Sequence, residues 1–193
     1  MSSRLKRCLE ESPVVSMGDY DYMVCPITDG IPSMDPKVLD EIIERIMKAS
    51  DLDCDIIVAP EAMGIPLAVP LSLRTGIPYN IVRKRKYGLP GEVSVSQITG
   101  YSKCQMYING LKAGDRVVIV DDIVSTGGTL AAIVQALRSM GVEVVEVITV
   151  IEKGAGKERL EKKLALRIIT LVKAEVVNGR VVASDPECSK GHS

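Results

Sequence analysis

The sequence predicts a single α/β domain built around a mainly parallel, twisted sheet that is flanked by helices. Short segments rich in Val and Ile alternate with segments whose apolar residues recur at helical spacing, a pattern typical of strand–helix–strand units. The chain has 193 residues, the size of one such domain, and 46% of them are hydrophobic, enough for a core of ordinary size. Near the C-terminus, an Asn-Gly pair between two Val-rich segments predicts a β-hairpin.

The N-terminal part of the chain predicts one short and one long helix. Residues 2–11 form an amphipathic pattern that suits a short helix on the outside of the domain, and residues 14–31 are typical of irregular strand and loop. Asp35 followed by Pro36 predicts a helix start, because the carboxylate can cap the free amides and proline suits the first helical position. Apolar residues then recur every three or four positions to about Ser50.

The rest of the chain alternates between strands and helices. We expect strands over residues 55–60, 79–83, 104–108, 116–120 and 142–151, and helices over residues 64–75, 127–140 and 157–163. Residues 84–100 are rich in Gly, Ser and Lys without periodicity, which predicts a long functional loop. The expected division is an N-terminal segment 1–34, a core 35–173, a hairpin 174–184 around Asn178-Gly179, and a tail 185–193, all within one domain.

Composition and charge exclude several classes of function. The chain carries 24 basic and 25 acidic residues, which argues against a protein that binds nucleic acid through an overall positive charge. We expect no nucleic-acid partner. No apolar segment approaches the roughly 20 residues of a membrane helix, and the N-terminus lacks a signal-peptide core. We therefore expect no membrane partner and a cytoplasmic location. The five cysteines form no C-x-x-C pair, and the single histidine is His192, so a disulfide scaffold, a Cys/His zinc site and a histidine-dependent hydrolase are not expected.

The segment from residue 117 to residue 130 has the strongest chemical signature in the chain. Four apolar residues are followed by Asp121 and Asp122, and a turn of sequence Ser-Thr-Gly-Gly-Thr then opens into a helix. The turn offers backbone amides at the positive end of a helix, which suits a phosphate group, and Gly127 and Gly128 allow close approach. The two carboxylates suit sugar hydroxyls or hydrated Mg²⁺. These residues predict a site for a phosphorylated ribose, and the P-loop and dinucleotide-binding glycine patterns are both absent.

This segment closely resembles the phosphoribosyl-pyrophosphate (PRPP) motif of type I phosphoribosyltransferases. Three further segments, residues 60–64, 83–91 and 94–101, support the resemblance, which extends from about Ser12 to Ala183. The chain is most similar to archaeal hypoxanthine/guanine phosphoribosyltransferases, which share the architecture of adenine phosphoribosyltransferases. The resemblance implies the type I phosphoribosyltransferase fold, with a small hood formed by the N-terminal segment and a C-terminal hairpin.

The resemblance also implies a reaction and a PRPP site. A purine base would displace pyrophosphate from C1 of PRPP, giving a purine nucleoside monophosphate, with Mg²⁺ as the cofactor. The ribose hydroxyls would be bound by Asp121 and Asp122, directly or through the metal, which the two carboxylates would contact largely indirectly. The implied PRPP-binding residues are Asp121, Asp122, Val124, Ser125, Thr126, Gly127, Gly128 and Thr129. The family also implies a homodimer.

Two further segments resemble the family's pyrophosphate-binding loop and its mobile catalytic loop. The implied pyrophosphate-binding residues are Glu61, Ala62, Met63, Gly64, Arg83 and Lys84, with a cis peptide expected between Glu61 and Ala62. The cations from residue 83 to residue 86 would stabilise negative charge on the departing oxygen. The implied catalytic loop spans residues 86–101 and includes Lys86, Tyr87, Gly88 and Tyr101. This loop would exclude water from the activated sugar.

One residue bears on the choice of purine. Lys153 corresponds to a lysine that contacts the exocyclic oxygen in related enzymes, and an ammonium group can only donate, so it favours hypoxanthine or guanine over adenine. Cys25 and Ile27 are expected on the other wall of the base site. Gly100 and Ser125 stand where relatives carry acidic residues, so the general acid or base stays unassigned. An adenine phosphoribosyltransferase and a PRPP-sensing regulator remain the alternatives.

Overall fold

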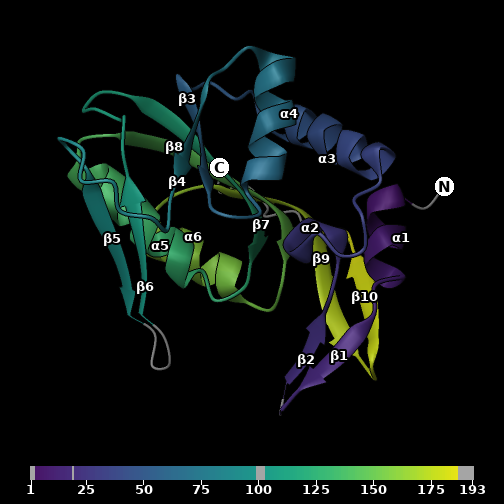
Figure 1. The fold of residues 1–193 in the computed structure, drawn as a ribbon. Coiled ribbons are helices and arrows are strands. Elements are labelled where there is room, and N and C mark those ends of the chain that lie inside the picture. Colours follow the sequence, from purple (N-terminus) through teal and green to yellow (C-terminus); the bar gives the residue numbers. More distant parts are fainter. Residues whose placement is uncertain (1–2, 19, 99–102, 187–193) are drawn as a thin grey trace.

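A six-stranded sheet forms the centre of the molecule (Figure 1). The computed structural model describes residues 3–18, 20–98 and 103–186. The strands are β1 (Val14–Met17), β2 (Tyr20–Met23), β3 (Ile56–Pro60), β4 (Tyr79–Val82), β5 (Val93–Ile98), β6 (Lys103–Ile108), β7 (Arg116–Val124), β8 (Glu143–Glu152), β9 (Ile168–Val177) and β10 (Arg180–Ser184). The helices are α1 (Arg4–Glu10), α2 (Pro26–Asp29), α3 (Pro36–Ala49), α4 (Ile65–Thr75), α5 (Gly128–Ser139) and α6 (Gly156–Leu164).

The topology of this sheet confirms the predicted fold class. The strand order is β10-β9-β8-β7-β3-β4, and every neighbouring pair is parallel except β9 and β10. Because the five parallel strands run in one direction, their carboxyl ends all lie at the same edge of the sheet. Ligands of open α/β sheets bind at that edge.

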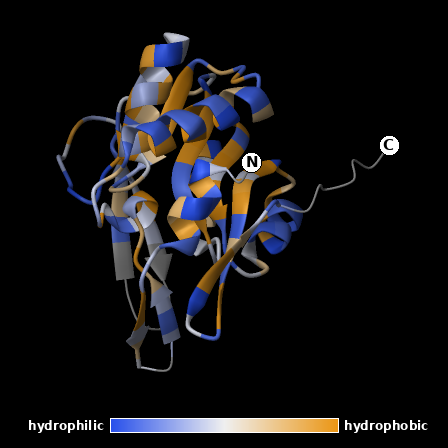
Figure 2. Cartoon of the chain, turned by 90° about the vertical axis from the view of Figure 1, so that its right-hand side faces the viewer, coloured by the Kyte–Doolittle hydropathy of each residue, from blue (hydrophilic) through white to orange (hydrophobic). Residues whose placement is uncertain are grey.

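Helices cover both faces of the sheet and create two hydrophobic cores. In β7, Val118 and Val120 pack in the core formed with α1, α3 and α4, whereas Val117 and Ile119 pack in the core formed with α5, α6 and the β5–β6 hairpin. Figure 2 shows the largely hydrophobic strands in the interior of the molecule. A strand buried on both faces is apolar throughout, which explains why the sequence of β7 is continuously hydrophobic up to Asp121.

The predicted start of the long N-terminal helix is confirmed. α3 begins at Pro36, and the side chain of Asp35 accepts a hydrogen bond of 2.8 Å from the amide of Lys37. α1 is an outer helix whose Leu5 and Leu9 are fully buried against the first core. Residues 14–31, predicted to be irregular strand and loop, contain the antiparallel pair β1–β2 and, in addition, the short helix α2, which was not predicted.

The expectation of a continuous loop over residues 84–100 was wrong, because β5 lies within it. β5 pairs with β6 in an antiparallel hairpin, and Val95 is buried while Ser94 and Ser96 are exposed. The alternation of Val and Ser from residue 93 to residue 96 is the period-two signal of a half-buried strand. Among the described residues of this stretch, the irregular part is therefore 84–92, before the hairpin.

The C-terminal hairpin is confirmed, but it is continuous with the sheet. Asn178 and Gly179 both have positive φ, 51° and 73°, as a two-residue hairpin turn requires. The expected core boundary at residue 173 falls inside β9, which pairs in parallel with β8. Part of the expected tail, residues 187–193, lies outside the described residues. Across the described part of the chain, every helix is too short or too polar to cross a bilayer.

Candidate active site

Four loops meet at the carboxyl edge of the sheet, and they carry most of the predicted site residues. Because the strand order there is β4-β3-β7-β8, the loops are ordered across the edge in the same way. Arg83 follows β4, residues 61–64 follow β3, residues 125–127 follow β7, and Lys153 follows β8. Segments that are almost 100 residues apart in the sequence are thus brought side by side by the parallel topology.

Asp121 and Asp122 lie within the end of β7 rather than beyond it. The strand continues to Val124 because its backbone stays paired with β8 as far as Glu152, whereas the sequence predicted an end at residue 120. The amide of Asp122 donates to Asp121 Oδ1 at 3.0 Å, and the amide of Ile123 donates to Asp122 Oδ1 at 2.9 Å. Neighbouring residues of a strand point to opposite faces, so the two carboxylates depart from the strand in different directions.

The two carboxylates are half-buried and poorly compensated. Burial raises the pKa of Asp121 well above its usual range, and the charge of Asp122 adds to the rise. Burial also raises the pKa of Asp122, and the carboxylate of Asp29 contributes in the same direction. In the part of the chain that the structure describes, neither aspartate forms an ion pair with Lys or Arg. The arrangement therefore favours a ligand that brings positive charge or hydroxyl donors.

The turn after β7 forms the floor of a cavity of about 250 Å³. Ser125 and Thr126 are exposed, while Gly127 is buried, has a φ of 74° and precedes the first residue of α5. The twelve-residue helix directs the positive end of its dipole towards this turn. The cavity is lined by Asp121, Asp122, Ile123, Ser125, Thr126, Gly127, Gly128, Thr129 and Leu130. The predicted PRPP residues thus converge on one cavity, apart from Val124, which is buried beneath it.

The loop after β3 lies next to the acidic pair. Its Glu61–Ala62 peptide is cis, as expected from the resemblance. A Cβ atom added to Gly64 would lie 2.8 Å from the carbonyl oxygen of Val120 and 2.9 Å from that of Pro60. Only glycine lets this loop approach the backbone of β7 just before Asp121.

Glu61 joins this loop to the cationic segment. Its Oε2 accepts a hydrogen bond of 3.0 Å from the amide of Lys84 and lies 3.3 Å from Nε of Arg83. The side chain of Lys84 is exposed, as are those of Arg85 and Lys86. Two ammonium groups and one guanidinium are thus directed to solvent beside the loop after β3, where they can meet an anion.

Glu92 organises the irregular segment that follows, and the sequence analysis did not identify it. Its carboxylate accepts hydrogen bonds from the amides of Tyr87 and Gly88, at 2.9 and 3.0 Å, and from Nδ2 of Asn109 at 3.0 Å. The predicted loop residues Lys86, Tyr87 and Gly88 are all exposed. Tyr101, the last predicted loop residue, lies outside the described residues.

Lys153 is half-buried at the end of β8 and contacts Tyr20 of β2. Its amide donates to the carbonyl of Val124 at 2.9 Å, which fixes it beside the turn after β7. Its ammonium lies 4.3 Å from the centre of the Tyr20 ring and donates to the tyrosine hydroxyl. Tyr20 is 49% exposed, and no motif in the sequence distinguished it.

Cys25 and Ile27 are 0% and 2% exposed, so their side chains pack in the core rather than line an open surface. Their contact with a base stays a prediction, which this burial does not favour. The more accessible group of this region is Asp29, which accepts hydrogen bonds from the hydroxyl groups of Thr28 and Tyr22 and from the amide of Cys25. Burial opposes ionisation of Asp29, but these three donors outweigh it and lower its pKa.

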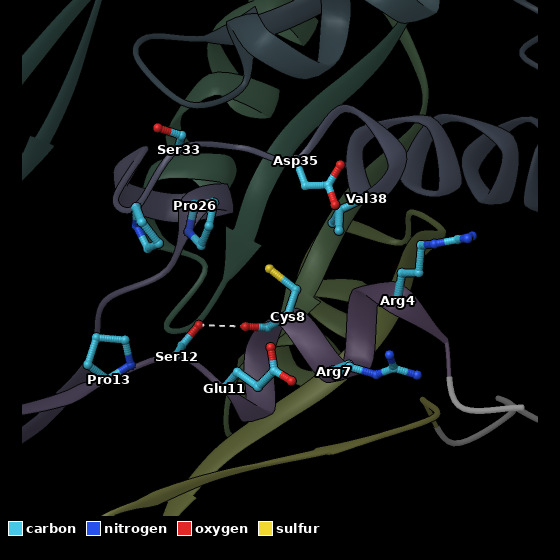
Figure 3. Close-up of a pocket in the computed structure, with 11 residues that line it drawn as sticks. Arg4, Arg7, Cys8, Glu11, Ser12, Pro13, Pro26, Ser33, Asp35 and Val38 are labelled. Atoms are coloured by element: carbon cyan, nitrogen blue, oxygen red, sulfur yellow. Dashed lines mark hydrogen bonds between the residues drawn. The ribbon is translucent and has the colours of Figure 1, made fainter.

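A second cavity, of about 390 Å³, lies away from this edge, between α1, α2 and the start of α3 (Figure 3). Figure 3 shows the Cys8 thiol directed into it from α1. Prolines and opposite charges, among them Arg4 and Glu11, share its lining. None of the predicted site residues that the structure describes contributes to its lining.

The acidic pair fits a magnesium ion that is bound partly by substrate. Among the described residues, no group of three or more His, Cys, Asp or Glu side chains could hold a metal alone. Mg²⁺ is commonly bound by one or two carboxylates together with waters and substrate oxygens. The uncompensated charge of Asp121 and Asp122 meets that requirement.

Comparisons with known proteins agree with this geometry. The phosphoribosyl transferase domain family matches residues 36–182. A hypoxanthine/guanine phosphoribosyltransferase from Methanothermobacter thermautotrophicus is 52% identical over 185 residues, with 96% of each chain covered. The enzyme of the same name from Methanocaldococcus infernus is 54% identical over 180 residues, covering 93% of this chain and 98% of its own.

Solved structures give the same result for the fold. An adenine phosphoribosyltransferase from Thermoanaerobacter pseudethanolicus superimposes with a TM-score of 0.73 at 29% identity, covering 88% of this chain and 99% of its own. One from Trypanosoma brucei has a TM-score of 0.73 at 20% identity and covers 98% of this chain and 87% of its own. The match of the family model, the near-complete relatives and the shared fold together show that this chain belongs to the type I phosphoribosyltransferase family.

Proposed function

We propose that this protein transfers the 5-phosphoribosyl group of PRPP to hypoxanthine or guanine, giving the purine nucleoside monophosphate and pyrophosphate. A bond forms between a purine ring nitrogen and C1 of the ribose, the bond from C1 to the pyrophosphate oxygen breaks, and the nitrogen releases its proton to solvent. The observation that carries the proposal is the placement of the acidic pair and the turn after β7 around one cavity. The loop after β3 and Lys153 flank that cavity on opposite sides.

The turn after β7 would bind the 5-phosphate. Its backbone amides lie at the start of α5, where the helix dipole favours negative charge, and the exposed hydroxyls of Ser125 and Thr126 can donate as well. Asp121 and Asp122 would accept hydrogen bonds from the ribose hydroxyls. A ribose bound in this way directs C1 towards the neighbouring loops.

The loop after β3 and the cations after β4 would bind the leaving pyrophosphate. The transition state resembles an oxocarbenium ion, with negative charge growing on the departing oxygen. Arg83 and Lys84 provide positive charge close to residues 61–64, and such preorganised charge lowers the barrier. When Mg²⁺ is bound, it neutralises part of the pyrophosphate charge.

The choice of a 6-oxopurine rests on Lys153 and on the sequence relatives. An ammonium donor matches the O6 acceptor of hypoxanthine or guanine and has no partner on the amino group of adenine. The archaeal relatives at 52 and 54% identity are named for hypoxanthine and guanine. The adenine enzymes among the structural neighbours keep adenine as the second candidate.

The deciding experiment measures pyrophosphate release from PRPP with hypoxanthine, guanine, xanthine and adenine in turn. We expect release with hypoxanthine and guanine in the presence of Mg²⁺, and its loss when the metal is chelated. Release with adenine alone would move the assignment to adenine transfer. Release with none of the four bases, despite PRPP binding, would indicate a PRPP-sensing regulator. Light scattering of the same sample tests the homodimer implied by the family.

A further inference from the structure

We propose that Gly156, the first residue of α6, is a positioning residue. Because it has no side chain, α6 can pack directly against the backbone of the phosphate-binding turn and fix the position of that turn. The inference rests on the proposed function, because it concerns how the turn at residues 125–127 binds the 5-phosphate. Gly156 is separated from Ser125 by 31 positions in the sequence and is not among the predicted binding residues.

The contact between α6 and the turn leaves no room for a side chain. A Cβ atom on Gly156 would lie 1.5 Å from the carbonyl oxygen of Ser125, 2.6 Å from its carbonyl carbon and 3.2 Å from that of Thr126. All three atoms belong to the backbone, so no side-chain rotation relieves the overlap. Gly156 does not have a positive φ, so the residue is required for space and not for a left-handed conformation.

A buried polar cluster holds the first turn of α6 in this position. Nζ of Lys157 lies 3.2 Å from Oγ1 of Thr170 in β9 and 3.8 Å from Oε2 of Glu152 in β8, and Thr170 donates to Glu152 at 3.0 Å. The side chains of Lys157 and Glu152 are only 11% and 16% exposed. Moving α6 outwards would separate these charges, which is costly in a buried setting.

A second contact one turn further along α6 reinforces the arrangement. Leu160 is 4% exposed, and a Cβ atom on Gly127 would lie 2.9 Å from its Cδ2. Two residues of α6 therefore pack against the turn: Gly156 lies against the backbone of Ser125, and Leu160 lies against Gly127. With α6 held by its polar cluster, the turn is the part that must move when Gly156 gains a methyl group.

The size of the displacement follows from the geometry. Real Cβ atoms essentially never approach within 3.0 Å of another heavy atom, so a contact of 1.5 Å requires a separation of about 1.5 Å. A shift of this size breaks hydrogen bonds from the turn to the phosphate, and a lost hydrogen bond to a charged group corresponds to about a 10- to 100-fold loss of affinity. We therefore expect Gly156→Ala to weaken binding of ribose 5-phosphate about 100-fold.

The experiment compares two ligands on the wild type and two variants by titration calorimetry. Ribose 5-phosphate probes the turn after β7, and pyrophosphate probes the loops after β3 and β4. Gly154→Ala is the control for backbone strain near Lys153, because a side chain at its φ of 67° is strained but its added Cβ would meet no described atom within 4 Å. We expect Gly156→Ala to lose ribose 5-phosphate affinity while keeping that for pyrophosphate, and Gly154→Ala to keep both.

The outcomes distinguish a failure of the positioning role of Gly156 from a failure of the proposed function. Equal ribose 5-phosphate affinity in Gly156→Ala and Gly154→Ala would overturn the positioning role, as would a parallel loss of both ligands in Gly156→Ala. If Gly156→Ala does not fold, Lys157→Met is tested instead, because it releases α6 without adding atoms at the contact. It should lower ribose 5-phosphate affinity about tenfold, as expected for one lost hydrogen bond to a charged group, and leave pyrophosphate affinity unchanged. Unchanged affinity in Lys157→Met would then overturn the inference. A wild type that binds no ribose 5-phosphate would instead reject the proposed function.

Discussion

Replacing Lys153 by Met tests the base assignment, because Met keeps the length and apolar stem of the side chain and removes only the donor. In the structure, the backbone of Lys153 is fixed by its hydrogen bond to Val124, so the substitution leaves the position of the residue unchanged. A hydrogen bond from a charged group contributes about 1.5–3 kcal/mol. At 1.4 kcal/mol per factor of ten, this predicts a loss of about 10- to 100-fold with hypoxanthine and guanine.

The assay is kcat/KM for each purine at saturating PRPP. We expect kcat/KM to fall for hypoxanthine and guanine and to stay level or rise for adenine, since the ammonium has no partner on adenine N6. The ammonium also contacts the ring of Tyr20 at 4.3 Å, a cation–π interaction that contributes about 0.5–1 kcal/mol at an exposed site. Tyr20→Phe is therefore the control, since it keeps the ring and removes the hydroxyl.

The result that would refute the reasoning is an equal loss with all three bases. Such a loss would mean that Lys153 acts on catalysis or on the docking of β2 and not on the exocyclic oxygen. If Lys153→Met keeps the preference among the purines but loses thermal stability, the role of Lys153 is structural and depends on its contact with Tyr20.

Three more predictions concern the acidic pair, the loop after β3 and the N-terminal region. Asp122→Asn should lower kcat/KM for PRPP about 100-fold, and unchanged kinetics would contradict its role. The same variant should raise the unfolding temperature of the unliganded protein at neutral pH, because burial raises the pKa of Asp122 and so disfavours the charge that the substitution removes. Gly64→Ala should lower kcat/KM for PRPP by about 100-fold, since its Cβ would lie 2.8 Å from the Val120 carbonyl, and crystallography of the variant would show whether the loop moves. Asp29→Ala should reduce the free energy of unfolding by about 2 kcal/mol at pH 7, as measured in urea. Burial opposes ionisation of Asp29, but its hydrogen bonds outweigh burial and lower its pKa, so its contribution is fully present above the unfolded pKa. The difference between the two proteins should therefore begin to shrink as the pH falls below about 4 and continue to shrink as the pH passes the lower folded pKa.

Local patterns predicted the order and type of most elements. The capped start of α3, the apolar strand β7 and the Asn178-Gly179 turn each depend on residues that are adjacent or one helical turn apart, and all three were found where expected. Two of the errors concern strands. β7 is longer than predicted because β8 continues beside it, and β5 was missed although it alternates Val and Ser and pairs with the next strand, β6, in a hairpin.

The phosphate- and ribose-binding segment could be predicted because the residues that form it follow one another in the sequence. Two aspartates, a hydroxyl-rich turn and a helix start occupy one short stretch, and the structure places them around one cavity. Tyr20 and Glu92 could not be found in this way, since Tyr20 contacts a residue of another segment and Glu92 accepts hydrogen bonds mainly from backbone amides. Tyr20 contacts Lys153, which is 133 positions away, and Glu92 holds two amides that carry no sequence signal of their own.

The sequence by itself determined the family and the phosphate-binding chemistry, since the residues that create a local anion site and its sugar-binding carboxylates are neighbours in the chain. Only the tertiary structure decided how four loops align along one edge and how closely α6 approaches the turn. Such proximity depends on strand order and on the packing of backbones from distant segments. A glycine such as Gly156 shows its importance only when the atoms that a side chain would meet are in place.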